Sequence, residues 1–178
     1  VLTGTGNAAL IARAGLREVR ELDWWEAHDL PGGHRVTYLP MRHGSARGFG
    51  DRCRALWGGF AIETAQGARA FFCGDTAWGP HIAEIGERLG PFDVALVPIG
   101  AYEPRWFMRS VHMDVEEALE AHRALRARTS IAMHFGVYKL TREPIGEPVE
   151  RLLALRGEAD FRVRAFGETL TVPLSRSG

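Results

Sequence analysis

The stretch Phe71-Phe72-Cys73-Gly74-Asp75-Thr76 opens the part of the chain that decides the fold class, because an apolar strand there runs directly into a polar loop. From this point the sequence alternates between apolar strands and amphipathic helical patterns. The further elements of the alternation are expected at residues 81–89 (helix), 93–99 (strand), 114–128 (helix), 130–133 (strand) and 148–155 (helix). Strands that alternate with helices are typical of layered folds. The sequence therefore predicts an α/β fold.

Before this stretch, the sequence predicts mainly strands joined by turns. The expected elements are a helix at 7–15 and strands at 17–22, 35–40, 56–63 and 69–73. The last two strands are expected to form a hairpin through Ala65-Gln66-Gly67. Downstream, Asp114 with Glu117 three residues later is a capping-box pattern that predicts a helix start. Residues 161–172 are expected to form two short strands around Gly167.

The composition fits one globular domain, with 178 residues of which 46% are hydrophobic and 25% charged. Lys+Arg and Asp+Glu both number 22, and no run of like charges forms an arm for nucleic acid, so a dedicated nucleic-acid partner is not expected. No segment approaches about 18 uninterrupted apolar residues, which argues against a membrane span. Cys53 and Cys73 are too few for a disulfide framework, and we expect reduced thiols in or near the core of a cytoplasmic protein.

Three polar residues stand where apolar strands stop: His43, Asp75 and His134. The carboxyl ends of strands form the crevice where α/β sheets bind ligands. Imidazole nitrogen and carboxylate oxygen both suit zinc, and a carboxylate can reach two metals at once, so these residues predict a divalent metal site. The alternative is that each is an isolated strand-end residue, with Asp75 as a helix N-cap and His134 as a core histidine.

The remaining histidines divide into one site candidate and four structural ones. His112 lies on a loop just before the capping box, where it is a candidate general acid or a group behind the metal ligands. A solvated loop histidine is the alternative. His122 falls inside the helix of residues 114–128, and the other three, His28, His34 and His81, are expected on surface turns or at a helix start.

An aromatic loop follows the strand of residues 93–99. It contains Tyr102, Glu103, Arg105, Trp106 and Phe107. Arg105 is a candidate to hold a phosphate, and Trp106 with Phe107 is a candidate contact for an acyl chain or a membrane surface. We therefore expect Tyr102, Arg105 and Trp106 to bind substrate. The alternative is a loop folded over the core, in which Glu103 and Arg105 satisfy each other.

Several motifs, taken in order, resemble one protein family. They lie at residues 21–26, 56–59, 74–76, 90–93, 98–108 and 112–114. The run PIGAYEPRWFM at 98–108 is much more specific than any of the shorter motifs. At these positions the chain resembles the metallo-β-lactamase superfamily, and more closely the N-acylphosphatidylethanolamine-hydrolysing phospholipase D group and its bacterial relatives.

The resemblance implies an αββα sandwich with two zinc ions, in which a metal-activated hydroxide attacks a phosphodiester. By position, His43 resembles the third metal-binding histidine of the family, Asp75 the bridging aspartate and His134 the last histidine. His112 matches a histidine near the reacting phosphate. In the prediction, Asp75 and His112 are therefore the catalytic residues.

One family motif, His-x-His-x-Asp-His, which supplies four further metal ligands, does not occur in the 178 residues. Three ligands do not fill two zinc shells. We therefore expect residues 1–178 to be a single partial domain, the carboxyl-terminal portion of a longer enzyme. The substrate is less defined, because residues 42–45, 74–77 and 134–137 each depart from the pattern of the family.

The expected function is that of a zinc-dependent phosphodiesterase acting on a phospholipid or a small phosphodiester. A sugar-phosphate lactonase-like hydrolase is one alternative, and an inactive fragment or binding module is another. The expected location is cytoplasmic, with transient contact to the inner face of the membrane as a further hypothesis. A homodimer is left open by the sequence.

Overall fold

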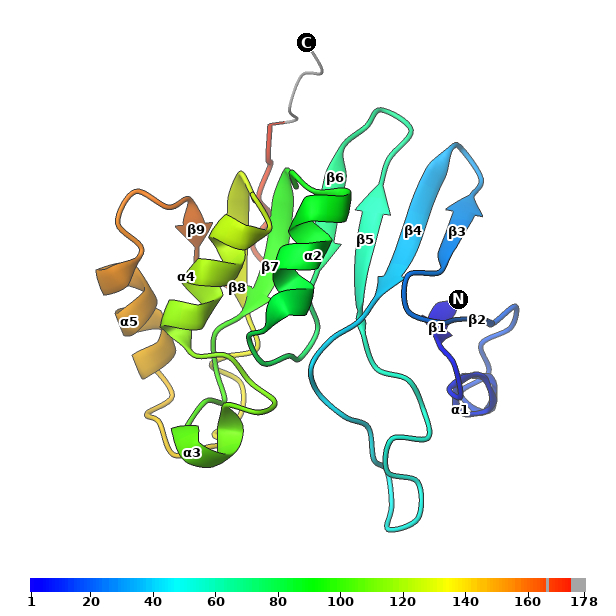
Figure 1. Ribbon diagram of the computed structural model, residues 1–178, viewed down its shortest axis with the longest axis horizontal. Coiled ribbons are helices and arrows are strands. Elements are labelled where there is room, and N and C mark those ends of the chain that lie inside the picture. The colour runs from blue at the N-terminus through cyan, green and yellow to red at the C-terminus, as the bar shows by residue number, and fades with distance from the viewer. Residues whose placement is uncertain (166, 174–178) are drawn as a thin grey trace.

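The computed structural model describes residues 1–165 and 167–173, and within them seven strands form the main sheet (Figure 1). In spatial order these strands are β3 (Ala27–Leu30), β4 (His34–Leu39), β5 (Gly59–Glu63), β6 (Arg69–Phe72), β7 (Val94–Pro98), β8 (Thr129–Met133) and β9 (Phe161–Arg162). Close to the N-terminus, a small parallel sheet pairs β1 (Leu2–Gly4) with β2 (Arg20–Leu22), and the helix α1 (Ala8–Arg13) connects them.

The direction of the strands determines where their ends meet. Neighbouring strands from β3 to β6 are antiparallel, whereas those from β6 to β9 are parallel. Parallel neighbours need crossover connections, which here contain α2 (Pro80–Leu89), α4 (Val115–Ala124) and α5 (Glu147–Leu155). Consequently β4, β6, β7 and β8 all point the same way, and their carboxyl ends share the lower edge of the sheet in Figure 1.

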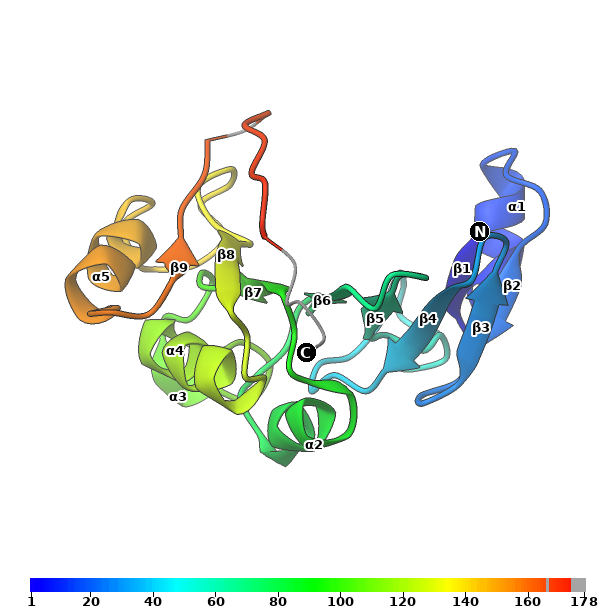
Figure 2. The same ribbon diagram turned by 90° about the horizontal axis from the view of Figure 1, so that it is seen from above.

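The hydrophobic core lies between the sheet and helices α2 and α4, which cover one face of it (Figure 2). Alternate strand residues point to this face, and Phe71, Ala95 and Val97 are completely buried there. Helix α2 contributes Ile82 and Ile85, which are also completely buried. Removing a large apolar side chain from water stabilises a fold by about 1.5–3 kcal/mol, so this layer supplies much of the stability.

The opposite face of the sheet carries an apolar row. The strand register aligns Phe60, Phe72, Leu96 and Ile131 side by side, and Phe72 is 42% exposed. The main sheet therefore has helices on one face, which corresponds to one helix and sheet layer of the expected sandwich.

Gly86 sets the distance between α2 and α4. A Cβ atom at this position would overlap the carbonyl oxygen of Ala124 and would lie 3.0 Å from the Cα of Leu125. Both neighbours are backbone atoms, which cannot rotate away. The two helices can therefore pack this closely only with glycine at position 86.

We predict that Gly86→Ala destabilises the protein by about 1–3 kcal/mol, the usual cost of an overpacked contact, despite the higher helix propensity of alanine. Urea denaturation followed by circular dichroism measures the change. Gly48→Ala is the matched control, because a Cβ at Gly48 meets no atom within 4 Å. Equal stability of the two variants would contradict the proposed role of Gly86.

Most elements that the sequence predicts are confirmed, including the hairpin of β5 and β6 and the strand and helix alternation after it. The capping box of Asp114 and Glu117 is present, with both reciprocal hydrogen bonds.

Asp75 is not a helix N-cap, because α2 begins five residues later, after Gly79. His122 is structural as expected, since it is buried and its Nδ1 lies 2.8 Å from the Ser130 hydroxyl.

Other expectations are wrong. The helix predicted to reach residue 128 ends at Ala124, and β3 and the short helix α3 (Arg105–Met108) were not expected. Of the two strands predicted around Gly167, only β9 forms; residues 163–165 and 167–173 contain no strand, and residue 166 lies outside the described residues. Cys73 is buried, but Cys53 is exposed rather than near the core. In the described part of the chain, no helix is long and apolar enough to cross a membrane.

Candidate functional site

Four predicted site residues meet at the lower edge of the sheet. His43 follows β4, Asp75 follows β6, and His134 directly follows β8. His112 comes from the loop between β7 and α4. Because β4, β6 and β8 run in the same direction, their carboxyl ends bring residues that are far apart in the sequence to one place (Figure 1).

His112 lies at the centre of this cluster. Its ring centroid is 5.2 Å from that of His43 and 5.2 Å from that of His134, with which it stacks. Asp75 joins the cluster through His134, since its Oδ1 lies 3.4 Å from the Nε2 of that imidazole. The structure thus places all four residues within one contact network.

The local charges set the protonation of the cluster. A hydrogen bond from His134 lowers the pKa of Asp75, and the same contact raises the pKa of His134. Burial, and then the nearby His134, lowers the pKa of His112 to about 4. His112 is therefore a neutral imidazole near pH 7, with one nitrogen able to donate and the other able to accept.

The backbone at His134 adopts an unusual conformation. His134 has a φ of 57°, in the left-handed region that non-glycine residues seldom adopt. Such conformations persist only where the surrounding structure imposes them, and they cluster at functional sites. Gly100 leaves room for this backbone, because a Cβ at position 100 would overlap the carbonyl oxygen of His134.

Thr76 connects three loops of the site. Its hydroxyl accepts a 2.9 Å hydrogen bond from the backbone N–H of Arg42, next to His43. Its carbonyl accepts a 3.0 Å bond from the N–H of Met113, next to His112. The Thr76 side chain is completely buried, and it also lies 3.0 Å from the Nε2 of His81. His81 therefore supports the site from behind.

We predict that Thr76→Val, which keeps the shape but removes the hydroxyl, costs about 1–3 kcal/mol of stability because the Arg42 N–H is left without its partner. Thermal unfolding measures this loss. Thr37→Val in β4 is the control, since no hydrogen bond of its hydroxyl is found among the described residues and valine favours strands. The interpretation fails if the two variants lose the same stability.

The guanidinium of Arg105 binds groups of the protein itself. Its Nη1 donates to the carbonyl of His112 at 3.1 Å and its Nη2 to Glu117 at 2.8 Å, while its Nε lies 3.2 Å from Asp114. The expected pairing with Glu103 involves only the backbone N–H of Arg105. Arg105 therefore fastens the His112 loop to the start of α4, and its role as a substrate ligand stays a prediction.

The other two candidate substrate residues have opposite environments. Tyr102 is completely buried and its hydroxyl donates to Glu147 at 2.9 Å, so it presents no surface to a ligand in this structure, and its role in substrate binding stays a prediction. Trp106 is 78% exposed, and its role in substrate binding stays a prediction.

Glu143 is a site-supporting residue that sequence reasoning missed. Its buried carboxylate accepts hydrogen bonds from the backbone N–H groups of Ala101, Tyr102 and Glu103, at 2.7, 3.3 and 3.1 Å. Burial by itself would raise its pKa, but hydrogen bonds from Thr141 and these N–H groups lower it overall. An acidic residue between arginine and proline in a polar loop gives no sequence signal of this role.

We predict that Glu143→Gln destabilises the fold by about 1–3 kcal/mol at pH 7, because a charged acceptor of three N–H bonds is lost. The pKa of Glu143 is lower in the folded than in the unfolded state, so its contribution is present above the unfolded pKa of about 4.3 and is lost as the pH falls through the folded pKa. The difference between wild type and variant should therefore shrink below pH 4.

Urea titrations at pH 7 and pH 3 check this dependence. The exposed Glu158, for which the described residues offer no hydrogen-bond partner, gives the matched control Glu158→Gln. A pH-independent loss in the Glu143 variant would contradict the proposed role of the charge.

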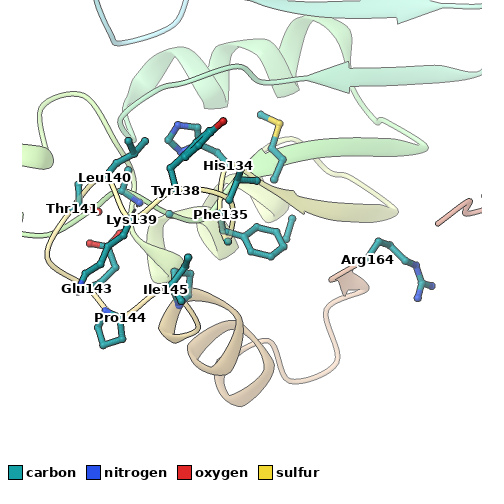
Figure 3. A pocket seen from close by; sticks show the side chains of 17 residues that line it. His134, Phe135, Tyr138, Lys139, Leu140, Thr141, Glu143, Pro144, Ile145 and Arg164 are labelled. Atoms are coloured by element: carbon teal, nitrogen blue, oxygen red, sulfur yellow. Dashed lines mark hydrogen bonds between the residues drawn. The ribbon is translucent and has the colours of Figure 1, made fainter. Parts of the chain in front are cut away.

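A pocket of about 450 Å³ opens beside His134 (Figure 3). The loop after β8 forms most of its wall, and the lining is largely apolar; labelled side chains around it include Phe135, Tyr138, Leu140 and Ile145. Ligand pockets of this size are typically apolar with a few polar groups that orient the ligand. The polar and charged residues of the lining are His134, Lys139, Thr141, Glu143 and Arg164.

The donor atoms of the cluster suit a divalent metal, although they do not form a complete site. Among residues 1–165 and 167–173, no group of three or more His, Cys, Asp or Glu side chains is arranged to hold a metal ion. However, the Nδ1 atoms of His112 and His134 are buried without a hydrogen-bond partner in this part of the chain. The Nδ1 of His43 lies 2.8 Å from the Gly44 carbonyl, a backbone contact of the kind that orients metal-binding histidines.

Comparison with known proteins identifies the family to which this fold belongs. The sequence profile described as "Beta-lactamase superfamily domain" matches residues 1–135. The chain belongs to the beta-lactamase superfamily and has the metallo-β-lactamase fold. The predicted family is thus confirmed.

Two curated relatives are phospholipases by name. The chain is 43% identical over 150 residues to N-acyl-phosphatidylethanolamine-hydrolyzing phospholipase D 1 of Caenorhabditis elegans, an alignment that covers 82% of this chain and 42% of the relative. It is 29% identical over 166 residues to the mitochondrial N-acyl-phosphatidylethanolamine-hydrolyzing phospholipase D of Saccharomyces cerevisiae, covering 90% of this chain and 36% of the relative. The chain therefore spans less than half the length of these relatives.

A solved structure supports the fold alone. The metallo hydrolase Igni18 of Ignicoccus hospitalis matches with a TM-score of 0.71 at 23% identity, covering 98% of this chain and 69% of that one. The names of these relatives describe hydrolases, and the name of Igni18 describes a metallo hydrolase.

Proposed function

We propose that the protein is a phosphodiesterase of the phospholipase D type that uses two zinc ions and acts on N-acylphosphatidylethanolamine-like lipids. The observation that carries the proposal is the meeting of His43, Asp75, His112 and His134 at one edge of the sheet. The identity of 43% to a phospholipase of this type supports the substrate class.

In this proposal His43, Asp75 and His134 would hold metal. Bound zinc supplies Lewis acidity and lowers the pKa of water. Three ligands do not complete two zinc shells, so the proposal requires further ligands. Thr76 keeps the loop of His43 beside the loop of Asp75 while metal binds.

His112 acts on the substrate in this proposal. Its low pKa keeps the ring neutral, so one nitrogen can donate a hydrogen bond to a phosphoryl oxygen. Arg105 fixes the position of the His112 carbonyl, and Glu143 fixes the neighbouring loop. Groups held in this way stabilise developing charge without reorganising during the reaction.

The pocket beside His134 supports a lipid rather than a sugar phosphate as substrate. Its lining is largely apolar, and its volume of about 450 Å³ lies in the range of ligand pockets. An acyl chain gains free energy by leaving water for such a surface, whereas the hydroxyl groups of a sugar would lose hydrogen bonds with water there.

We predict about two zinc ions per chain in a protein that spans the length of its relatives, and hydrolysis of N-acylphosphatidylethanolamine in mixed micelles. Asp75→Ala should lower kcat on the order of 10³-fold, because metal activation is worth several kcal/mol. Elemental analysis and product release measure the two outcomes. His28→Ala in β3, away from the cluster, is the control.

Two results would contradict the proposal. Hydrolysis of a lactone but not of the phosphodiester would identify another hydrolase of this fold. Full activity of the Asp75→Ala variant would show that the cluster takes no part in the reaction.

A further inference from the structure

Lys139 is the only lysine of the chain, among 22 lysine and arginine residues. It lies in the loop after β8 and lines the pocket beside His134 (Figure 3). The ammonium group of lysine is a compact charge on a flexible stem of four carbons, so it can follow a ligand over several positions. Lys139 therefore places one movable positive charge at a pocket whose lining is largely apolar.

Other charged side chains of this pocket are already paired within the protein. The Nε2 of His134 lies 3.4 Å from the Oδ1 of Asp75, and the Nη1 of Arg164 lies 3.3 Å from the Oε1 of Glu168. Lys139, by contrast, is exposed and forms no ion pair with any of residues 1–165 and 167–173. Its charge is thus free to meet a ligand.

The carboxylate of the pocket lining does not neutralise Lys139. Glu143 is only 7% exposed. Its Oε1 accepts from the backbone N–H groups of Ala101 and Tyr102, and its Oε2 accepts from that of Glu103. Hydrogen bonds of this kind bind a carboxylate strongly, so both oxygens of Glu143 are directed at the protein. An anion at the pocket therefore meets the charge of Lys139 first.

We propose that Lys139 determines substrate specificity, by making the pocket prefer amphiphiles of net negative charge to zwitterionic ones. This inference rests on the phosphodiesterase function proposed above and adds the charge of the substrate to it. The apolar wall takes the hydrocarbon chain, while the ammonium group attracts a phosphate and repels an ammonium or choline group. Specificity of this kind combines attraction of one ligand with repulsion of its competitor.

This preference separates an N-acylated lipid from its parent. In phosphatidylethanolamine, the negative phosphate is balanced by a positive ammonium group on the same head group. N-acylation converts that amine into a neutral amide, which leaves the phosphate as the only charge. Lys139 therefore favours the N-acylated lipid by charge alone, even though the acylated head group is bulkier.

The test measures binding to the 178-residue chain and uses no turnover. The probes are decyl phosphate and decylphosphocholine, which share one hydrocarbon chain, and each is kept below its critical micelle concentration. Isothermal titration calorimetry gives both Kd values. We expect decyl phosphate to bind about fivefold more tightly, the effect of one pair of unit charges at close range in water. The preference should shrink as salt rises to about 0.5 M, because the exposed charge is screened.

Four variants separate the charged from the apolar contribution. Lys139→Glu should invert the preference, which a purely structural role of the side chain would not do, and Lys139→Arg should keep it. Arg13→Glu is the matched control, because it makes the same change of charge at the end of α1, far from the pocket (Figure 1). Ile145→Ser, in the pocket wall, should weaken both probes and leave their ratio unchanged. Circular dichroism confirms that each variant is folded.

Because the chain has one lysine, its side chain can also be observed directly. Reductive methylation with ¹³C-formaldehyde keeps the positive charge and labels only Lys139 and the α-amine of Val1. In NMR titrations, decyl phosphate should shift the Lys139 signal and leave the Val1 signal in place. Inorganic phosphate, which lacks the hydrocarbon chain, should shift it only at much higher concentration.

Four results would overturn the proposal: equal affinity of the wild type for the two probes, an unchanged preference in Lys139→Glu, a Lys139 signal that decyl phosphate does not move, and inorganic phosphate binding as tightly as decyl phosphate. Failure of the proposed reaction is a separate outcome. A chain with the expected charge preference, whose longer form hydrolyses no phosphodiester, would contradict the proposed function and leave the role of Lys139 in binding intact.

Discussion

Parallel pairing of β6, β7 and β8 is the constraint on which the rest of the structure depends. Each parallel neighbour must be reached by a crossover, so α2 and α4 are placed on one face of the sheet and their apolar sides form the core. The same pairing sends the chain back to one edge after every strand. The residues that follow β6 and β8, Asp75 and His134, therefore meet, and His112 joins them from the loop before α4.

Behind this cluster lies a layer of polar side chains that hold backbone rather than substrate. Thr76 connects the loops of His43 and His112, Arg105 joins the His112 carbonyl to α4, and Glu143 gathers three N–H groups of the aromatic loop. Buried polar groups of this kind stabilise a site only when all are satisfied, because an unpaired one costs more than its bond contributes. The positions of the site loops thus depend on side chains that bind backbone groups.

The two faces of the main sheet differ, because the core lies on only one of them. One sheet face is covered by helices, while the other presents the row of Phe60, Phe72, Leu96 and Ile131. At the edge of the site, Trp106 and Tyr138 are exposed on loops whose inner residues Tyr102 and Glu143 are buried.

The sequence by itself determined the order of most strands and helices, because the period of apolar residues specifies each element locally. It also identified His43, Asp75 and His134 as candidates, because each follows an apolar strand. Tertiary structure alone decided which polar groups serve which role. The partners of Arg105 lie 7 to 12 residues away and those of Glu143 40 to 42 residues away, and burial of Tyr102 depends on packing around it. A local pattern carries no record of such contacts, since each arises only when distant segments fold against one another.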